Sequence, residues 1–460
     1  MHLRGDELYY HEAALGLLDG DWLVNAQHPP LVKELMALAH LALGDTLVAA
    51  RLPSAIATWL TGLVIALLVW RIGRPGRWST VAGVVTALVW WALPFAPGRT
   101  ATLEAVMGLF VAAAQLAWLH AVARRQTRWL LVGGALTGLA AACKMTGAVA
   151  LLGLVPAAVA LRRPRGSARV LPFAVGAAVV AGLAWLFPFV PMEGDAAAAM
   201  TTPVTFQLEH AQAGHAVVVA GETHQHAPIW SSLWFSVERL GVPAAAGLVV
   251  ALLVGWVRHG LRATPVGVTL LGLVLALSLS PVQLPHYQYV WWPLVVALAG
   301  AALAPSSGSR SGRRAVAATV VAALALLPAV RLGVEQVEVV ARTQPSGLVL
   351  APDVVRAEVP AGTTLTVWAD PWTVRTALPE RHLTTRMPGS LAPRALLVDP
   401  AVARGSAATD LDLWRSCRPV GYEEHEIGEL LLLVRRADPH PAFEPAPRCL
   451  PLLPRPIGSR

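Results

Sequence analysis

Long apolar segments separated by short polar turns run through most of the chain. We predict membrane-spanning helices near residues 52–70, 79–96, 103–122, 129–142, 145–161, 170–190, 237–257, 264–280, 287–304 and 315–331. A helix needs about 20 apolar residues to cross a hydrocarbon layer roughly 30 Å thick, and most of these segments approach that length. The pattern therefore predicts a mainly α fold, with a polytopic membrane bundle of about ten helices over residues 51–332.

The first fifty residues have a different pattern and form a first loop ahead of the bundle. Residues 7–18 and 30–43 predict two short helices, and the first is amphipathic, as a helix lying in the membrane interface would be. Pro30 suits the first turn of the second helix because its fixed φ is already helical. A further long loop is expected at residues 191–236.

Residues 333–460 differ again, because their apolar runs are short and prolines and acids appear. We predict strands at residues 364–370, 394–400 and 428–436, with a short helix over 371–378. Strands and helices in this order indicate a small C-terminal α/β domain. The last twenty residues form a proline-rich tail.

Composition agrees with a membrane protein and argues against a nucleic-acid partner. The mean hydropathy is +0.55, and 55% of residues are hydrophobic against 14% charged. The net charge of +8 comes from arginines in short turns rather than from a basic surface with interleaved aromatic residues. These arginines are Arg71, Arg74, Arg77, Arg124, Arg125, Arg128, Arg162, Arg163, Arg165, Arg169, Arg258, Arg262, Arg310, Arg313 and Arg314.

Basic turns mark the cytoplasmic side of a membrane protein. We therefore expect a multi-pass protein of the plasma membrane, with the N-terminal loop, the 191–236 loop and the C-terminal domain outside the cytoplasm. The sequence shows no helix ahead of Asp6 that would carry the first loop across the membrane. Either the true start lies upstream and a first spanning helix is missing, or the chain is a divergent or truncated copy.

The three cysteines have different expected roles. Cys143 lies in an apolar run and reads as a packing residue. Cys417 and Cys449 could pair as a disulfide if the C-terminal domain is outside the cell.

The expected topology gathers the unusual polar residues on the outer side. Ionisable side chains at membrane depth are expensive and are by default functional candidates. The residues on this side are Asp6, Glu7, His11, His28, Lys33, Arg99, Glu104, Lys144, His210, His215, His224, His226, His286, Tyr287 and Tyr289.

Such a face could transfer a sugar carried on a polyprenyl phosphate. One carboxylate can act as the base for an acceptor hydroxyl. The leaving group is already a phosphate, so it needs cations rather than a general acid. A glycosidase instead needs two cooperating carboxylates. The residues therefore suggest an inverting transfer with a single base.

Six segments together resemble the protein O-mannosyltransferase family of the GT-C membrane glycosyltransferases. They are D-E-x-x-x-H at 6–11, H-P-P-L-x-K at 28–33, R-T-A-T-L-E at 99–104, G-L-A-A-A-C-K-M-T-G at 138–147, H-A-P-I-W-S-S-L-W at 226–234 and L-P-H-Y-Q-Y-V-W-W-P at 284–293. Their order, spacing and common side make the resemblance specific over about residues 5–305. The chain lacks the β-trefoil repeats of eukaryotic members.

The resemblance implies transfer of a hexose, mannose in the type family, from a polyprenyl-phosphate donor to an exported acceptor hydroxyl, with protein Ser/Thr as the first choice. Asp6 would be the base, with Glu7 beside it, and Glu104 matches the family's second acidic position. The expected substrate-binding residues are His28, Lys33, Arg99, Lys144, His226, His286 and Tyr287, of which we choose Arg99 and Lys144 for the lipid phosphate. The partners implied are the lipid-linked sugar, membrane lipid and an exported protein or glycan. No residue is assigned to a metal, and a requirement for a divalent metal stays open.

Other interpretations remain at this stage. Asp6 and Glu7 could be only the acidic first turn of a helix, Lys33 could reach to lipid headgroups, and Lys144 could cap the preceding helix. The histidines of the 191–236 loop could bind a metal, line a substrate site or be solvated. Alternative functions are sugar transfer to a lipid or cell-wall glycan, secondary transport, and a non-catalytic membrane scaffold.

Overall fold

The computed structural model describes residues 6–93, 100–162, 170–215, 217–306, 313–342, 347–369, 374–375, 377–384, 392–399 and 421–436. The α-helices are α1 (Asp6–Leu18), α2 (Leu31–Leu43), α3 (Leu47–Ile72), α4 (Arg77–Ala92), α5 (Leu103–Arg124), α6 (Arg128–Cys143), α7 (Leu154–Arg162), α8 (Val170–Leu186), α9 (Ala196–Ala213), α10 (Ser231–Leu240), α11 (Val242–His259), α12 (Thr264–Ser278), α13 (Trp292–Ala301), α14 (Arg313–Arg342) and α15 (Gly347–Glu358). The 3-10 helices are η2 (Met145–Gly153), η3 (Phe187–Asp195), η4 (Gly260–Arg262) and η5 (Tyr287–Val290).

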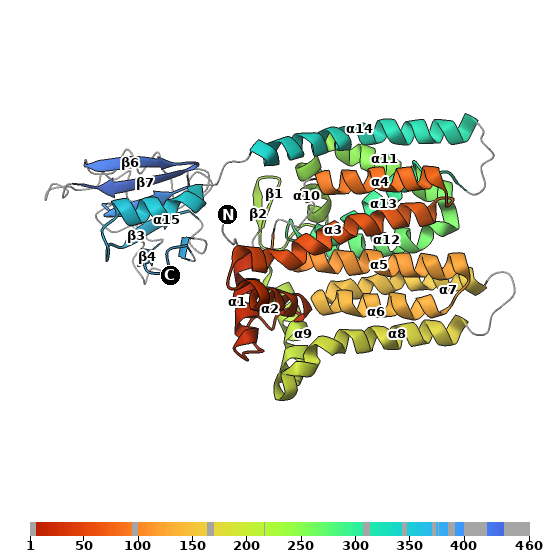
Figure 1. Cartoon of the computed structure of the whole chain (residues 1–460), viewed down its shortest axis with the longest axis horizontal. Coiled ribbons are helices and arrows are strands. Elements are labelled where there is room, and N and C mark those ends of the chain that lie inside the picture. The colour runs from red at the N-terminus through yellow and green to blue at the C-terminus, as the bar shows by residue number, and fades with distance from the viewer. Residues whose placement is uncertain are drawn as a thin grey trace. The chain divides into compact units, whose positions relative to one another are not determined.

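Two compact units make up the chain. One unit is Tyr9–Arg342, and the other combines Met1–Leu8 with Thr343–Arg460. The first unit holds the helices α2 to α14 and the second holds the C-terminal sheet with α15 (Figure 1).

The helices of the Tyr9–Arg342 unit confirm the predicted membrane bundle. The stretches long and apolar enough to cross a membrane are Leu47–Ile72, Leu103–Arg124, Met145–Arg162, Val170–Ala213, Val242–Arg262 and Val316–Glu338. Shorter apolar helices are Arg128–Cys143, Thr264–Ser278 and Trp292–Ala301. Each predicted span overlaps one of these segments or α4.

Outward faces of the bundle are apolar, as contact with lipid requires. On α8, Leu171, Val179 and Leu183 are each exposed by more than half. On α14, Leu324 and Leu327 are exposed to a similar degree. Monomeric soluble proteins rarely carry apolar surface on this scale.

Boundaries differ from the prediction where a glycine or a 3-10 turn interrupts the helix. The predicted span 237–257 is divided at Gly241, whose φ of 72° ends α10 and precedes α11. The spans expected to start at residues 145 and 287 begin as the 3-10 helices η2 and η5. Helix α14 continues to Arg342, beyond the expected end of the membrane region at residue 332.

The described basic turns, α3–α4, α5–α6 and α11–α12, lie at one end of the bundle (Figure 1). The backbone N–H of Arg74, in the α3–α4 turn, donates to Pro305 O beyond α13 at 2.8 Å. The Arg262 guanidinium, after α11, donates to Gly73 O of the α3–α4 turn at 3.4 Å. Arg71 is hydrogen-bonded to His120 near the end of α5. The opposite ends of α5 and α6 carry Glu104 and the residue following α6, Lys144.

Residues 191–236 are not a plain loop, which corrects the sequence interpretation. They contain most of η3, helices α9 and α10 except for the last residues of α10, and an antiparallel hairpin of β1 (Val217–Val219) and β2 (Glu222–His224). The hairpin packs Val217 and Val219 against Phe235 of α10. The segment is therefore a folded cap rather than a solvated connection.

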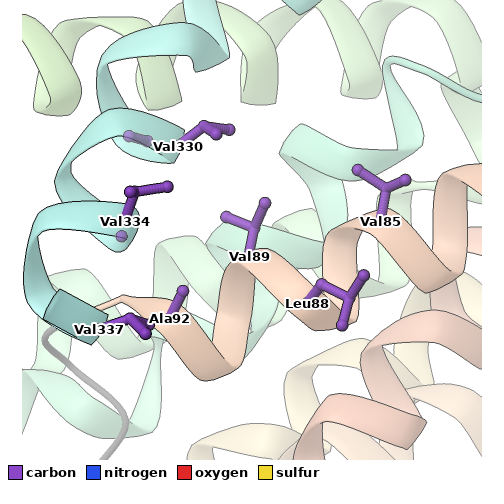
Figure 2. A pocket seen from close by; sticks show the side chains of 9 residues that line it. Val85, Leu88, Val89, Ala92, Val330, Val334 and Val337 are labelled. Carbon is purple, nitrogen blue, oxygen red and sulfur yellow. The ribbon is translucent and has the colours of Figure 1, made fainter. Parts of the chain in front are cut away.

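An apolar groove lies between α4 and α14. It has a volume of about 360 Å³. Its lining residues are Val85, Leu88, Val89, Ala92, Ala329, Val330, Gly333, Val334 and Val337, most of which Figure 2 labels. Since no polar side chain lines it, the groove suits a lipid chain and offers no chemistry.

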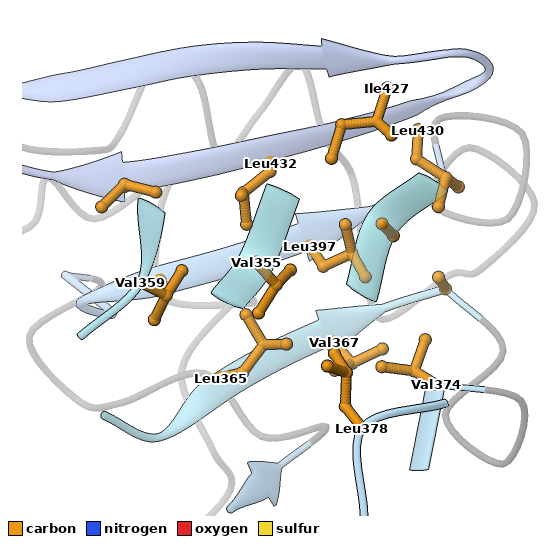
Figure 3. Close-up of a cluster of buried hydrophobic side chains, with 14 residues drawn as sticks. Val355, Val359, Leu365, Val367, Val374, Leu378, Leu397, Ile427, Leu430 and Leu432 are labelled. Carbon is orange, nitrogen blue, oxygen red and sulfur yellow. The ribbon is translucent and has the colours of Figure 1, made fainter. Parts of the chain in front are cut away.

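The C-terminal unit contains a five-stranded mixed sheet in the order β4-β3-β5-β7-β6. The strands are β3 (Leu365–Trp368), β4 (Leu383–Thr384), β5 (Ala395–Val398), β6 (Tyr422–Ile427) and β7 (Leu430–Arg435). Strand β3 is parallel to β4 and β5, and β7 is antiparallel to β5 and β6. Val355 and Ala351 of α15 pack on Leu365, Leu397 and Leu432 of the sheet (Figure 3).

The prediction found three of these strands, each with ends one or two residues beyond those observed, and missed β4 and β6. The small α/β domain is confirmed. Half of the helix expected at 371–378 falls outside the described residues, as do Cys417, Cys449 and the proline-rich tail.

Candidate functional site

Glu104 lies in the first turn of α5 and is fully buried. Ser54 of α3 fixes this end of α5, because its hydroxyl donates to Thr102 O at 3.1 Å and accepts from Thr102 N at 3.3 Å. Thr102 is the residue that precedes the helix. The carboxylate therefore sits on a backbone that two helices hold in place.

Lys144 follows α6 at a break in the helical backbone. Its own backbone is extended, with φ −159° and ψ 136°, and the 3-10 helix η2 begins directly after it. The break requires Gly147, since a Cβ there would lie 2.3 Å from the carbonyl carbon of Ala140. Lysine at this position can turn its side chain from the end of α6 toward α5.

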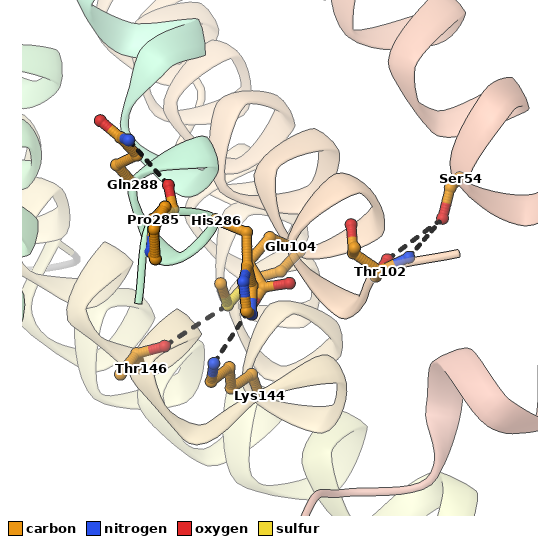
Figure 4. Close-up of polar contacts among 9 residues, drawn as sticks. Ser54, Thr102, Glu104, Lys144, Thr146, Pro285, His286 and Gln288 are labelled. Atoms are coloured by element: carbon orange, nitrogen blue, oxygen red, sulfur yellow. Dashed lines mark hydrogen bonds and ion pairs between the residues drawn. The ribbon is translucent and has the colours of Figure 1, made fainter. Parts of the chain in front are cut away.

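The structure brings Glu104, Lys144, His286 and Tyr287 into one cluster, of which Figure 4 shows the first three. Lys144 Nζ donates to Glu104 Oε1 at 2.8 Å. The same Nζ lies 3.3 Å from the ring centroid of Tyr287, as a cation–π contact. His286 Nε2 is 3.9 Å from Glu104 Oε1, and its ring meets Tyr287 edge to face at 4.9 Å between centroids.

Burial makes this cluster different from a surface ion pair. The Lys144 side chain is 8% exposed and that of Glu104 is not exposed at all, whereas His286 is 23% exposed. A buried pair is strongly coupled because removing one partner leaves an uncompensated charge in a low-dielectric site. His286 and Tyr287 are both partly exposed, whereas the ion pair between Glu104 and Lys144 is buried.

Two glutamines that the sequence analysis missed hold the His286 segment. Gln283 accepts from the Ser232 hydroxyl at 2.7 Å and donates to the carbonyls of Pro228, Ser278 and Ser280. Gln288 donates to Pro285 O at 2.7 Å. Both amides are nearly fully buried, so they act as positioning residues between α10 and the turn that carries His286.

The first loop forms a second group around Lys33. This side chain is only 2% exposed, and its Nζ donates to Asn25 O at 2.6 Å and His28 O at 2.8 Å. The interpretation that Lys33 reaches to lipid headgroups is therefore wrong, because the ammonium is turned onto the loop backbone. His28 itself packs edge to face against Tyr10 and Phe206, with centroids 6.0 and 6.3 Å apart.

The remaining predicted residues lie elsewhere. Asp6 and Glu7 occupy the acidic first turn of α1, and Glu7 is buried. His226 contacts α9, where its Nε2 lies 3.1 Å from Gln212 O, and the contacts described for it do not join the Glu104 cluster. Arg99 falls outside the described residues.

Comparison with known proteins points to one family. A family model described as dolichyl-phosphate-mannose-protein mannosyltransferase matches residues 27–191, which include Lys33, Glu104 and Lys144. An undecaprenyl phosphate-alpha-4-amino-4-deoxy-L-arabinose arabinosyl transferase of Pseudomonas aeruginosa (strain LESB58) is 30% identical over 304 residues, 61% of this chain and 52% of the relative. A Sodalis glossinidius protein of the same description is 29% identical over 268 residues, 55% of this chain and 45% of the relative.

Solved structures share the whole architecture. ArnT from Cupriavidus metallidurans bound to undecaprenyl phosphate matches with a TM-score of 0.56 at 17% identity, over 94% of both chains. The chain has the fold of the GT-C membrane glycosyltransferases. The apo Archaeoglobus fulgidus oligosaccharyltransferase has this GT-C fold too, with a TM-score of 0.51 at 14% identity over 83% of this chain and 61% of the other.

This GT-C chain spans about half the length of the curated relatives it matches. The match to ArnT, however, includes both the helices and the small C-terminal sheet, because it extends over 94% of each chain. The GT-C fold is thus established, and the reaction is argued below.

Proposed function

We propose that this GT-C chain transfers a sugar from a polyprenyl-phosphate donor to an exported acceptor. The observation that carries the proposal is the buried Glu104–Lys144 pair, with His286 and Tyr287 against it, at the bundle end opposite the basic turns. A transporter would be expected to hold its polar site near the membrane midplane, between broken repeats. Here the charged pair lies at helix ends instead.

The proposed roles follow from the charges. Lys144 carries the cation that stabilises the lipid phosphate as it leaves, and Glu104 and Tyr287 hold that ammonium in place when no donor is bound. His286, which is more exposed than Glu104 and Lys144, adds a second hydrogen-bond donor for the phosphate. Arg99 is proposed for the same phosphate.

Asp6 is proposed as the base that removes the proton from the acceptor hydroxyl, with Glu7 beside it. Attack on the anomeric carbon from the face opposite the phosphate forms the new glycosidic bond and inverts the configuration. His28, Lys33 and His226 are proposed to shape the acceptor side of the loop. The active loop and the C-terminal domain are proposed to lie outside the cytoplasm.

The acceptor divides the proposal in two. Our first choice, from the sequence motifs, is a mannose-like hexose transferred to protein Ser/Thr. The names of the curated relatives favour a second candidate, a transfer of 4-amino-4-deoxy-L-arabinose from undecaprenyl phosphate. The two candidates share the lipid-phosphate donor and differ only in sugar and acceptor.

The decisive experiment supplies the purified chain in liposomes with labelled polyprenyl-phosphate mannose and, separately, with labelled undecaprenyl-phosphate aminoarabinose. Each donor is offered together with a Ser/Thr-containing peptide or a glycolipid as the acceptor. Asp6→Asn should lower the rate of lipid-phosphate release at least a hundredfold, because a single base carries the transfer. Asp19→Asn is the matched control, since Asp19 is an exposed acid just after α1. Normal turnover by Asp6→Asn would overturn the mechanism, and which donor is consumed decides between the two candidates.

A further inference from the structure

Three side chains with metal-ligand chemistry meet at the first helices of the Tyr9–Arg342 unit. His11 comes from α1, His40 from α2 and Asp45 from the turn before α3. One ligand atom from each residue can be chosen so that the atoms all lie within 4.8 Å of one another. Among the described residues, His11, His40 and Asp45 form the group of three potential metal ligands that lie close enough together to hold an ion.

The two histidine nitrogens are as far apart as neighbouring ligands around one small cation. His11 Nδ1 lies 3.2 Å from His40 Nε2, and in a tetrahedral zinc site with bonds of about 2.0 Å neighbouring ligand atoms are about 3.3 Å apart. Asp45 Oδ1 lies 3.2 Å from the other ring nitrogen of His11, Nε2. Because one imidazole binds an ion through a single nitrogen, the exposed Asp45 side chain must move toward the ion to complete the site. Both histidines are less than a tenth exposed, so their rings are held by packing before any ion binds.

The hydrogen bonds fix which nitrogen of His40 can bind an ion. His40 Nδ1 lies 3.0 Å from Gly44 O. A carbonyl oxygen only accepts, so Nδ1 carries the hydrogen and Nε2 of the neutral ring turns a lone pair toward His11. Histidines that bind metals are commonly oriented in this way, with the other ring N–H donated to a backbone carbonyl.

This tautomer leaves an unfavourable contact in the metal-free protein. If His11 Nδ1–H donates to His40 Nε2, then His11 Nε2 presents a lone pair to the Asp45 carboxylate at 3.2 Å. Either a proton on His11 or a cation would relieve it. Burial lowers the pKa of His11, and the neighbouring His40 lowers it further, while Asp45 raises it without reversing the shift.

We propose that His11, His40 and Asp45 bind one divalent transition metal ion of the zinc class. Imidazole and carboxylate are ligands that Zn²⁺ accepts. The Asp45 side chain is 64% exposed, which leaves the fourth position to water. The ion joins α1, α2 and the turn before α3, and neither the GT-C family match nor the proposed transfer reaction requires it.

The test uses the full-length chain in detergent, stripped with a chelator and titrated with zinc chloride. We expect zinc to raise the thermal midpoint, since an ion that binds only the folded state stabilises it by mass action. His40→Ala should bind one equivalent of zinc fewer than the parent chain. His224→Ala is the control, because His224 ends β2 and belongs with His226 to the H-x-H segment, which is the rival histidine site. Equal zinc content in the parent chain and His40→Ala would overturn the proposal, as would a loss confined to His224→Ala.

Asp45→Asn keeps the test decisive if His40→Ala fails to fold. The asparagine amide can donate to His11 Nε2, so the metal-free variant should melt at the parent temperature or higher. Its zinc affinity should nevertheless fall at least tenfold, because a charged ligand is lost. If a proton on His11 occupies the site instead, Asp45→Asn lowers the metal-free midpoint and zinc shifts neither protein, which refutes the metal site.

Discussion

At the residue scale, Glu104 and Lys144 form a buried ion pair at the end of the membrane bundle. Glu104→Gln leaves the Lys144 ammonium buried without its counter-charge, and breaking a buried pair in this way costs about 3–5 kcal/mol. We therefore expect a large fall in the thermal midpoint of the detergent-purified protein. Lys144→Met should have an effect of similar size.

The double variant Glu104→Gln with Lys144→Met separates stability from function. Neutral side chains of similar volume remove both buried charges, so most of the lost stability should return. Sugar transfer should stay absent, because the cation for the phosphate is gone. A double variant as unstable as the sum of the single variants would show that the two charges are not coupled.

Lys33 and its neighbour Glu34 predict a minimum of stability near neutral pH. Both lie on α2, which is not among the membrane-spanning segments. Burial lowers the pKa of Lys33 from 10.5 to about 7, with Glu34 opposing the shift, and burial raises the pKa of Glu34 from 4.5 to about 7, with Lys33 opposing it.

The sign of each contribution follows from proton binding. Between pH 4.5 and 7 the folded chain holds a proton on Glu34 that the unfolded chain has lost, so the free energy of unfolding falls as pH rises. Between pH 7 and 10.5 the folded chain lacks a proton on Lys33 that the unfolded chain retains, so the free energy of unfolding rises with pH. The size of the pKa shift corresponds to a rise of about a few kcal/mol. The measurement is the thermal midpoint across this pH range. Glu34→Gln should remove the fall between pH 4.5 and 7, and Lys33→Met should remove the rise between pH 7 and 10.5. The assignment would be contradicted if both variants kept the fall and the rise.

The sequence could nominate these residues singly but could not pair them. Glu104 and Lys144 stand out because charges are rare in apolar segments, yet 40 positions separate them in the chain. Gln283 and Gln288 were missed because a neutral amide in a proline-containing turn carries no charge signal. His11 and His40, 29 positions apart, were not associated for the same reason as the ion pair: only folding brings α1 and α2 together.

At the element scale, the position of Lys144 depends on how closely α6 approaches α8. A Cβ at Gly134 would lie 2.2 Å from Ala177 O, and one at Gly138 would lie 2.1 Å from Ala181 O. Small residues four apart allow this close backbone contact between membrane helices. Gly138→Val should therefore force the helices apart and destabilise the protein by about 1–3 kcal/mol, measured as a lower thermal midpoint.

Gly182 on α8 is the matched control for Gly138, because no atom lies within 4 Å of a Cβ placed there. Gly182→Ala should leave the thermal midpoint unchanged or raise it slightly, since alanine is the better helix former. Equal effects of the two substitutions would mean that close α6–α8 packing does not limit stability.

Hydrophobic pattern predicted the helices of the bundle well and the cap poorly. Burial in lipid imposes long apolar runs, so α3, α5 and α11 were visible from composition alone. Helix α9 was missed because it contains Pro203 and lacks an apolar run, and β1 and β2 have only three residues each. Strand β6 reads YEEHEI and its two glutamates in succession hide the alternation that marks a strand.

At the scale of the whole molecule, the distribution of arginine predicts how the bundle lies in the membrane. Three arginines form hydrogen bonds at one end of the bundle. Arg74 bonds to Pro305, Arg262 bonds to Gly73, and Arg71 at the end of α3 bonds to His120 of α5. An excess of arginine marks the cytoplasmic side. The end with Glu104 and Lys144 should then face outward, where an exported acceptor would be available.

Cysteine labelling in intact cells checks this orientation. The background carries Cys143→Ala, Cys417→Ser and Cys449→Ser, which removes all three native thiols. Into it go Gln27→Cys, at an exposed position of the first loop, or Gln126→Cys, at an exposed position of the α5–α6 turn.

A maleimide that cannot cross the membrane should label Gln27→Cys and spare Gln126→Cys until the cells are opened. Because both sites are exposed in the folded chain, a difference in labelling reports the side of the membrane rather than burial. The reverse pattern would put the Glu104–Lys144 end in the cytoplasm. Transfer to an exported acceptor would then be excluded, although the GT-C fold would stand.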